Sequence, residues 1–146
     1  MHSYNQDQSL KLFVVMSRAM QSVTKRVEED IKSYGLNPTE FAVLELLYSK
    51  GEQPIQKIGE KVLLASSSIT YVVDKLEKKN YLTRKPCPKD RRVTYAAITE
   101  DGTNLMSDIF PKHRAAIDEI FGGLELEDKE DMIVQLKKLG FHAQEL

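Results

Sequence analysis

The sequence is poor in the residues that form covalent cross-links, metal sites and catalytic centres. It contains one cysteine, so neither an internal disulfide framework nor a CxxC metal site can form. The three histidines, His2, His113 and His142, are scattered and form no HExxH pair, and no glycine-rich phosphate loop is present. We therefore expect a protein that is not an enzyme, with no catalytic residues, no bound metal and no cofactor.

Long hydrophobic runs are also lacking. No apolar stretch reaches the roughly 20 residues needed to span a bilayer, and the first ten residues show no basic segment followed by an apolar one. The chain has 146 residues, of which 41% are hydrophobic and 29% charged, as is typical of a soluble globular protein. Together with the lone cysteine, these features predict one domain, with or without a helical extension, in the reducing cytoplasm and without a membrane partner.

Residues 55–78 show the pattern of two short helices joined by a tight connection. The first repeats apolar residues from Ile55 at helical spacing, and Ser66 offers a hydroxyl as the N-cap of the second. Small hydroxyl side chains at the start of the second helix allow close approach to base edges, and lysines further along can meet phosphates. We therefore predict a DNA recognition helix that reads the major groove with Ser66 to Lys75. Its apolar stripe is Ile69, Val72, Val73 and Leu76, and its polar face is Ser67, Ser68, Thr70, Tyr71, Asp74, Lys75 and Lys78.

The hydrophobic pattern changes after Asn80 to one typical of strands. Residues 81–85 and 93–98 read as two paired strands. Pro86 and Pro88, between them, fix the backbone and lack N–H donors, which predicts that both lie in a hairpin tip. A basic hairpin after a helix-turn-helix is a wing, and its arginines can enter a minor groove, where the potential is most negative.

Positive charge is concentrated in residues 75–92. This segment has eight Lys and Arg side chains and two acidic ones, a net of +6, whereas the whole chain is −1 and the remainder is therefore −7. A basic patch on an acidic body is the electrostatic footprint of a nucleic-acid-binding protein. The alternative is that a charged hairpin only keeps the surface soluble. The coincidence of the charge peak with the recognition-helix pattern favours DNA binding.

Further helical patterns flank this region. We expect one long helix over residues 9–34, and a second one from Pro38 that is apolar nearly all round and forms the centre of the core. Gln53–Pro54 leads into the helix-turn-helix. Beyond the wing, Thr99 should cap a helix that continues through Pro111 to about Phe121, and a last helix follows.

The first helix and the last two have apolar faces with little left to cover within one small chain. Pairing with a second copy buries them, so we expect a homodimer with two-fold symmetry. Its two recognition helices would read half-sites about 34–36 Å apart on one face of the duplex. The alternative is a monomer in which these helices fold back onto the core.

Three blocks of sequence carry a resemblance to the MarR family of bacterial transcriptional regulators: GLNPTEFAVLELL at 35–47, ASSSITYVVDKLEKKNYLTR at 65–84 and DRRVTYAAITEDG at 90–102. In the last block, Asp90-x-Arg92 followed by Ile98-Thr99 is similar to the wing signature of that family. The resemblance covers nearly the whole chain. It implies a mainly α fold (an α+β winged helix), in which a helix-turn-helix with a two-stranded wing is joined by N- and C-terminal dimerisation helices. The single domain 1–146 would consist of a DNA-binding lobe, 35–99, and dimerisation helices, 1–34 and 100–146.

The resemblance also implies roles for single residues of the wing. Arg92 would enter the minor groove, Asp90 would orient its guanidinium, and Arg91 would contact a phosphate. The implied function is a transcriptional regulator, most often a repressor, that binds a double-stranded, pseudo-palindromic operator as a homodimer. The predicted DNA-binding residues are Ser66, Ser67, Ser68, Thr70, Tyr71, Lys75, Arg84, Lys89, Asp90, Arg91 and Arg92.

A second resemblance concerns the effector. SLKLFVVMSRAM and GLNPTEFAVLELLY look like the branch of the family that controls quinone and catechol detoxification genes. This implies release of DNA when a small phenolic, aromatic or quinone-like effector binds between the dimerisation helices and the DNA-binding lobe, or when a cysteine is oxidised. The alternative for each residue of that region is plain core packing. In this sequence the region would include Phe13, Ser17, Phe41, Leu44 and Tyr48.

Cys87 lies between two prolines of the predicted wing, among lysines and arginines that favour the thiolate. Exposure at a hairpin tip would make it reactive toward quinones or oxidants, and an adduct there would oppose phosphate contact. The peroxide-sensing branch of the family carries its reactive cysteine in the first helix, where this chain has none. Cys87 is therefore a candidate sensor of a different kind, or an incidental surface thiol.

A contrasting hypothesis is a winged helix used only for protein contacts, without sequence-specific DNA binding. The hydroxyl-bearing helix face and the +6 segment argue against it, and weak, salt-insensitive DNA binding would argue for it. For His113 we expect a half-buried place on its helix or at the dimer interface.

Overall fold

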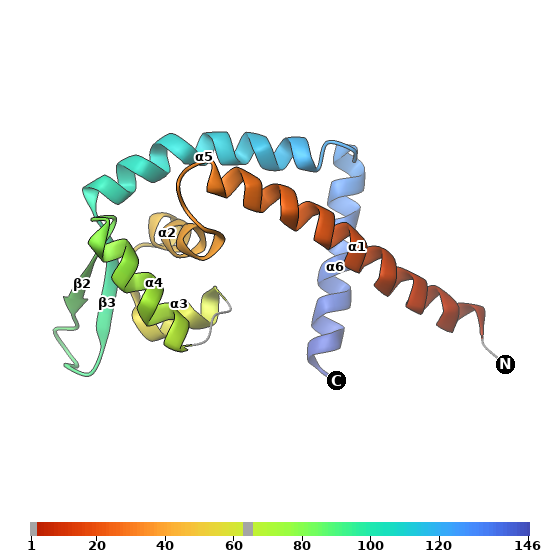
Figure 1. Ribbon diagram of the computed structural model, residues 1–146. Coiled ribbons are helices and arrows are strands. Elements are labelled where there is room, and N and C mark those ends of the chain that lie inside the picture. The colour runs from red at the N-terminus through yellow and green to blue at the C-terminus, as the bar shows by residue number, and fades with distance from the viewer. Residues whose placement is uncertain (1–2, 63–65) are drawn as a thin grey trace.

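Helices form most of the described chain, and a small antiparallel sheet lies at one end of the molecule (Figure 1). The computed structural model describes residues 3–62 and 66–146, apart from the side chains of Ser66 and Ser67. The predicted mainly α, winged-helix class is confirmed. The elements in chain order are α1 (Tyr4–Lys32), α2 (Pro38–Lys50), β1 (Gln53–Pro54), α3 (Ile55–Lys61), α4 (Ser66–Lys78), β2 (Leu82–Pro86), β3 (Thr94–Ile98), α5 (Glu100–Ile120) and α6 (Leu126–Gln144).

Local capping decides where several helices begin. Asn37 Oδ1 accepts a hydrogen bond from the backbone N–H of Glu40 at 2.7 Å, and the Glu40 carboxylate accepts one from the N–H of Asn37 at 3.0 Å. This reciprocal capping box starts α2. Thr99 caps α5 as predicted, and α5 runs through Pro111 without a break. The first helix begins earlier than predicted, because the side chain of Ser3 caps it.

The core surrounds α2, as its apolar pattern predicts. Val43, Leu44 and Leu47 are at most 1% exposed, and α2 packs against α4, α5 and β3. Figure 1 shows α2 enclosed between α5 on one side and the helix-turn-helix on the other. The stripe predicted on α4 is buried in full, and it consists of Ile69, Val72, Val73 and Leu76.

The sheet has three strands in the order β1-β3-β2, and its β2–β3 hairpin is the predicted two-stranded wing. Gln53–Pro54 leads into α3, as predicted, but it also forms a short strand paired with β3, which was missed because a two-residue strand shows no alternation in sequence. One detail of the predicted hairpin was wrong. Pro86 is the last residue of β2, paired with Thr94, and does not lie in the tip. A proline is tolerated there because β2 is an edge strand.

The turn between α4 and the wing is closely packed against α5. Asn80 adopts a positive φ of 66°, which asparagine tolerates better than most residues, and its side-chain amide donates to Asp101 at 2.7 Å. Gly102, in the first turn of α5, lies so close to Tyr81 that an added Cβ would collide with the backbone carbonyl of that residue. The recognition helix, the wing and α5 are therefore joined at one point.

The two terminal helices are much less covered. Among the described residues, α1 has one buried side chain, that of Ile31, and α6 has none. Both helices extend away from the winged-helix lobe, in different directions (Figure 1). Within the described ranges, no helix combines the length and the apolar character needed to cross a membrane.

Candidate nucleic-acid interface

The outer face of α4 is polar and open to solvent. Ser68, Thr70 and Tyr71 are exposed, with Tyr71 at 68%, while the opposite stripe of the same helix fills the core. The predicted roles of Ser66 and Ser67, including the N-cap, concern side chains outside the described residues. The described part of α4 therefore presents two small hydroxyls and one large aromatic side chain to a partner, a set suited to contact with base edges and phosphates.

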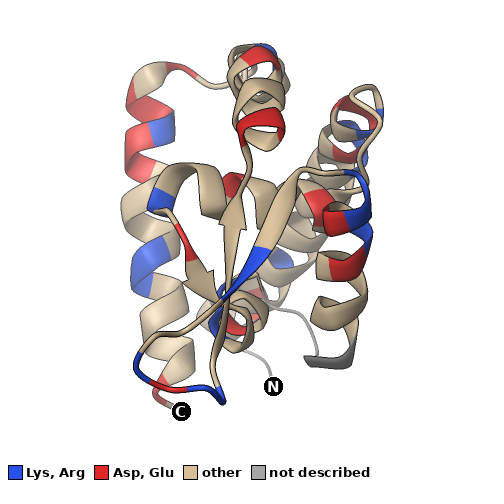
Figure 2. Ribbon diagram, turned by 90° about the vertical axis from the view of Figure 1, so that its left-hand side faces the viewer, with Lys and Arg blue, Asp and Glu red and all other residues tan. Residues whose placement is uncertain are grey.

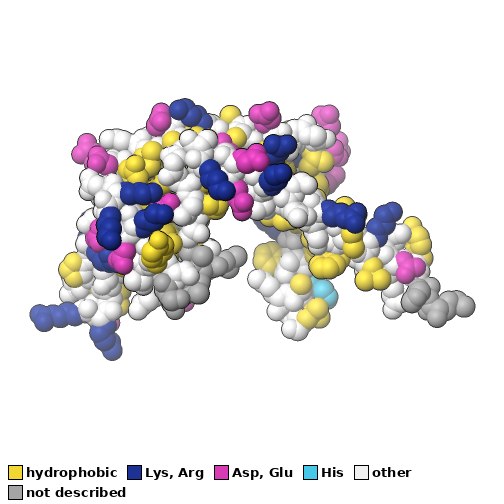
Figure 3. All heavy atoms as spheres, in the orientation of Figure 1, with side chains coloured by type: hydrophobic (Ala, Val, Ile, Leu, Met, Phe, Trp, Pro, Cys, Tyr) yellow, Lys and Arg dark blue, Asp and Glu magenta, His cyan; other side chains and the backbone are white. Residues whose placement is uncertain are grey.

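The wing projects beside this helix and ends in a tight loop. The N–H of Cys87 donates to the carbonyl of Val93 at 3.0 Å, and the N–H of Val93 donates to the carbonyl of Asp90 at 3.1 Å. Lys89 and Arg91 are exposed in the loop between the two strands. Figure 2 shows one basic stretch along a strand of the hairpin and others at its tip, and Figure 3 shows basic side chains projecting from this end of the molecule. The backbone hydrogen bonds that close the loop restrain the residues that carry these cations.

Arg92 is held in place by Asp90, as the resemblance implied. Its Nε lies 3.1 Å from Asp90 Oδ1 and its Nη2 lies 3.2 Å from Oδ2, and Oδ1 also accepts the backbone N–H of Arg92 at 3.0 Å. The hydrogen bond from the Arg92 side chain, followed by that from its backbone, lowers the pKa of Asp90. The side chain of Arg92 is nevertheless 91% exposed. Asp90 thus orients Arg92 without covering it, and leaves donors free for a second acceptor.

Arg84, one of the predicted DNA-binding residues, has acidic partners within the chain. Its two terminal nitrogens lie 2.5 Å from carboxylate oxygens of Asp74 and Glu77, both on α4. The hydrogen bond to Asp74 comes first among the causes that raise the pKa of Arg84. The pair of contacts ties the base of the wing to the recognition helix.

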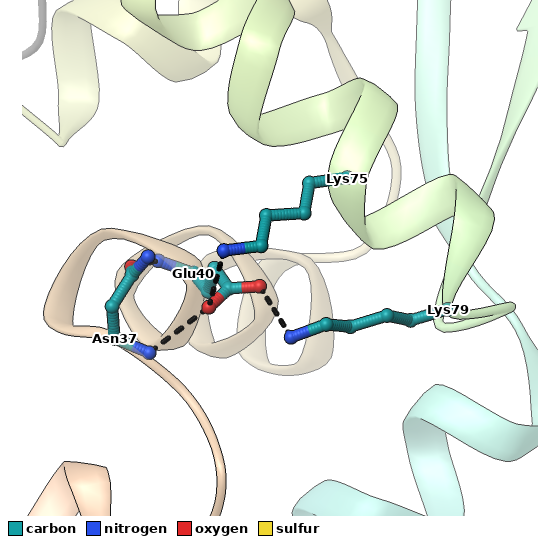
Figure 4. A network of polar contacts seen from close by, with 4 residues as sticks. All are labelled: Asn37, Glu40, Lys75 and Lys79. Carbon is teal, nitrogen blue, oxygen red and sulfur yellow. Dashed lines mark hydrogen bonds and ion pairs between the residues drawn. The ribbon is translucent and has the colours of Figure 1, made fainter.

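Lys75 also has an internal partner. The carboxylate of Glu40 lies at the back of α4, 2.8 Å from Lys79 Nζ and 4.0 Å from Lys75 Nζ (Figure 4). Burial raises the pKa of Glu40, but the hydrogen bonds from Lys79 and Asn37 and the charges of Lys79 and Lys75 outweigh it, so the pKa is lowered overall. Among the described residues of the basic segment 75–92, the cations without an ion-pair partner are Lys78, Lys89 and Arg91.

Cys87 is the one cysteine of the chain and is half-buried at the wing. Its backbone N–H is part of the closed loop. The structure therefore places it on the wing, as predicted, close in sequence to the exposed Lys89 and Arg91, but less exposed than expected for a hairpin tip.

A groove of about 620 Å³ lies where α1 and α5 meet α2. Phe41 lines it, and the ring of His113 packs on Phe41 with centroids 4.5 Å apart. His113 Nδ1 lies 2.8 Å from Asp30 Oδ2, and the hydroxyl of Tyr34 donates to the other oxygen of Asp30 at 2.7 Å. The prediction of a half-buried His113 is confirmed, whereas its link to Asp30 was not foreseen. Of this polar cluster, His113 lines the groove, beside the aromatic rings of Phe41 and Phe110.

Of the five predicted effector residues, Phe41 is the one that lines this groove in a single chain, as far as the described residues show. Leu44 is fully buried beneath it, and Tyr48 is 37% exposed and hydrogen-bonded to Ser107. Phe13 and Ser17 lie on the outer half of α1, where Phe13 is 70% exposed. One protomer therefore does not bring the five together.

Known sequences and structures agree with this architecture. The sequence profile described as the MarR family matches residues 36–94. The chain is 57% identical over 139 residues to the HTH-type transcriptional regulator MhqR of Bacillus subtilis, and the match covers 95% of this chain and 96% of that protein. The chain belongs to the MarR family. It is also 44% identical over 147 residues to the uncharacterized HTH-type transcriptional regulator YkoM of the same species, over 99% and 96% of the two chains.

Solved structures of MarR-family proteins share the fold over almost the whole chain. AbsC of Streptomyces coelicolor superposes with a TM-score of 0.84 at 20% identity, covering 100% of this chain and 99% of that one. A mutant MarR of E. coli, complexed with operator DNA, superposes with a TM-score of 0.78 at 17% identity, covering 95% and 99%. Membership of the MarR family makes this chain a transcriptional regulator and not an enzyme.

Two features of this MarR-family chain were missed in the sequence. The Asn37-x-x-Glu40 spacing was a visible signal for the capping box, but nothing in it showed that Glu40 would be buried against two lysines. Asp30 and His113 lie 83 positions apart, and no local pattern connects them.

Proposed function

We propose that this MarR-family regulator is a homodimeric repressor that binds a pseudo-palindromic DNA operator, in the cytoplasm. The observation that carries the proposal is the exposed guanidinium of Arg92, oriented by Asp90 on a wing that projects beside the polar face of α4. An oriented, uncovered arginine suits the narrow and negative minor groove, while the α4 face suits the adjacent major groove. The proposed contacts are Ser66, Ser67, Ser68, Thr70, Tyr71, Lys75, Arg84, Lys89, Asp90, Arg91 and Arg92.

The dimer is proposed from the uncovered apolar surface of the two terminal helices, α1 and α6, which we call the arms. A groove of about 800 Å³ between α5 and α6 is lined by Phe121, Met132, Ile133 and Leu136 among others. Surface of this kind on a monomer marks an interaction site. In the proposed division, residues 35–99 form the DNA-binding lobe, and residues 1–34 and 100–146 form the dimerisation helices. A second copy would also bring the outer half of one α1 to the other protomer.

The effector is proposed to be a small aromatic or quinone-like molecule. The groove at Phe41 supports this, because aromatic walls and the His113–Asp30 pair suit a ring that carries a hydroxyl or carbonyl group. Phe13, Ser17, Leu44 and Tyr48 complete the proposed site, the first two through the second copy. Modification of Cys87 is the alternative means of release.

The decisive test of DNA binding is Arg92→Ala. We expect its affinity for the DNA upstream of its own gene to fall about tenfold to a hundredfold, because an oriented minor-groove donor is lost. Dimerisation and thermal unfolding should stay unchanged, because the side chain is 91% exposed. The matched control is Arg26→Ala, which removes the same charge from an exposed position on α1.

Equal loss of affinity in both variants would show that Arg92 contributes only its charge and makes no specific contact in the minor groove. Weak, salt-insensitive binding by the wild type would instead favour a winged helix that contacts only proteins.

The effector test compares operator release by a small quinone in the wild type and in Cys87→Ser. Release of the wild type alone would assign sensing to the wing thiol. Release of both would favour the groove between the helices. Tight binding without any response would leave the regulator in place and remove the proposed effector class.

A further inference from the structure

One charged side chain is buried in the lobe. Glu40, in the first turn of α2, is 2% exposed, yet every other side chain at that level of burial among the described residues is hydrophobic. Burying a carboxylate is unfavourable unless it is paired and hydrogen-bonded. Glu40 meets that condition through three partners: the backbone N–H of Asn37 at 3.0 Å, Lys79 Nζ at 2.8 Å and Lys75 Nζ at 4.0 Å.

These partners come from two functionally different parts of the molecule. Asn37 is the N-cap of α2 and follows α1 after a short turn, so it belongs to the junction with the long N-terminal helix. Lys75 lies in the last turn of α4, and Lys79 is the first residue after that helix, where its backbone N–H donates to the carbonyl of Lys75 at 3.2 Å (Figure 4). One carboxylate therefore links the start of α2 to the recognition helix.

Apolar side chains of both helices also contribute to one buried cluster, which includes Val43, Leu44 and Leu47 of α2 and Val73 and Leu76 of α4. Apolar contact stabilises the pair of helices but is non-directional, so it sets their angle less sharply than a hydrogen bond does. The ion pair at one end of the interface supplies the directional contact. Lys75 and Lys79 reach toward α2, and the hydroxyl face of α4 points to solvent.

We propose that Glu40 is a positioning residue for DNA recognition, which holds the angle of α4 against α2 through Lys79 and Lys75 and so sets operator affinity without touching DNA. The inference rests on the proposed function, because it assigns a consequence for operator binding. Figure 4 shows the geometry on which it depends: the ammonium groups of Lys75, in the last turn of α4, and of Lys79, directly after it, are both directed at one carboxylate.

Glu40→Gln tests the proposal because charge and position predict opposite results. Removing a negative charge from the DNA-binding lobe strengthens DNA binding by electrostatics alone. Glutamine can still accept the N–H of Asn37, so the cap is retained, but its NH₂ group cannot accept from Lys79. We expect operator affinity to fall about fivefold to tenfold at full folding, with an unchanged slope of log K against log salt.

The matched control is Glu60→Gln, which removes an exposed carboxylate from α3 in the same lobe. It should bind the operator as tightly as the wild type, or more tightly. If Glu40→Gln behaves like Glu60→Gln, the positioning role is overturned.

A double variant separates positioning from direct contact by Lys79. When Lys79→Met is added to Glu40→Gln, we expect no further loss of affinity, because the link is already broken. If Lys79 contacts a phosphate instead, the double variant will bind more weakly than Glu40→Gln and its salt slope will fall by about one. That outcome would also overturn the proposal.

A measurement without DNA keeps this inference apart from the proposed function. Spin labels at Ser49→Cys, an exposed position of α2, and at Thr70→Cys on α4, in a Cys87→Ser background diluted with unlabelled protein, report the distance between these two helices within one chain. We expect a broader or shifted distance distribution in Glu40→Gln than in Glu60→Gln. Identical distributions would overturn the inference even if the wild type binds its operator. Failure of the wild type to bind would overturn the proposed function alone.

Discussion

The winged-helix lobe and the terminal helices are built on opposite principles. In the lobe, Leu44, Ile58 and Leu76 are fully buried, and one core joins α2, α3, α4, α5 and the sheet. In the arms, large apolar side chains such as Phe13, Met20 and Ile133 are half to more than two-thirds exposed. Figure 3 shows such side chains on the surface of the two extended helices. The lobe satisfies its own hydrophobic surface, whereas the arms need a partner to do so.

The two regions meet at a polar junction. There, Asp30 of α1 accepts a hydrogen bond from the hydroxyl of Tyr34 and pairs with the ring of His113 on α5. Glu40 is hydrogen-bonded to Asn37 and to Lys79, and so links the beginning of α2 to the end of α4. Polar contacts of this kind are directional, so they fix the angle between arm and lobe, although most of the apolar surface of the arms is uncovered. A regulator that must hold two recognition helices at a fixed separation needs this rigidity at the junction.

The largest expected effect comes from charging an arm. Ile133→Asp places a carboxylate on the apolar groove between α5 and α6. We expect the dimer to dissociate and the operator affinity to fall by about a hundredfold to ten-thousandfold, because the two half-sites can no longer be bound together. Sedimentation and a DNA titration measure both quantities.

The control for that variant is Gln135→Asp, an exposed position of the same helix that is not part of the groove lining. It should remain dimeric. A dimer that survives Ile133→Asp would show that the arms are not the interface, and the contrast between the two regions would lose its functional meaning.

A core truncation should act on the lobe instead. Leu76→Ala removes a side chain with 0% exposure and should lower the free energy of unfolding by about 3 kcal/mol. Urea unfolding at a protein concentration that maintains the dimer measures this. The exposed neighbour Lys78→Ala should change stability little. Equal midpoints for the two variants would contradict the view that the lobe has one tightly packed core.

The smallest expected effect is a titration at the junction. Burial, the hydrogen bond to Asp30 and the charge of Asp30 raise the pKa of Tyr34 to about 12. Because the folded pKa is raised above 10.0, this group contributes stability at pH values below 10.0, and the contribution is lost as the pH rises through about 12. Tyrosinate absorbance should contain a late-titrating component that arises from Tyr34.

Tyr34→Phe should remove that late component, whereas Tyr4→Phe, at a position 79% exposed, should leave it in place. A late component that persists in Tyr34→Phe would show that it arises from another tyrosine, and would contradict a raised pKa for Tyr34 at the junction.

The parts of the fold that repeat along the chain were predictable from the sequence. The buried stripe of α4, which includes Ile69 and Leu76, follows from helical period, and the wing follows from the change to a strand period after Asn80. The pairing of Asp90 with Arg92 was implied by a signature two residues apart. Each of these signals lies within one turn or one hairpin, where backbone geometry alone places the residues.

The contacts between distant segments were not predictable in this way. The +6 segment predicted a basic patch, but the sequence did not show that Arg84 is paired with Asp74 and Glu77, or that Lys79 is paired with Glu40. The strand at Gln53–Pro54 was also missed, since its partner β3 lies some forty residues away in the sequence. A count of charges does not say which of them are already neutralised by neighbours.

The sequence by itself determined the order of helices and strands, the faces that are apolar, and the place of the basic wing, because periodicity, capping and turn residues act over short stretches of chain. The tertiary structure decided which cations remain available to a partner, which carboxylate is buried behind the recognition helix, and how the arms join the lobe. Electrostatic and hydrogen-bond energies depend on distance in space and on burial. Glu40 shows the difference most clearly. The four-residue spacing from Asn37 to Glu40 indicates its capping position, but its pairing with Lys79 forms only when α2 and α4 are packed together.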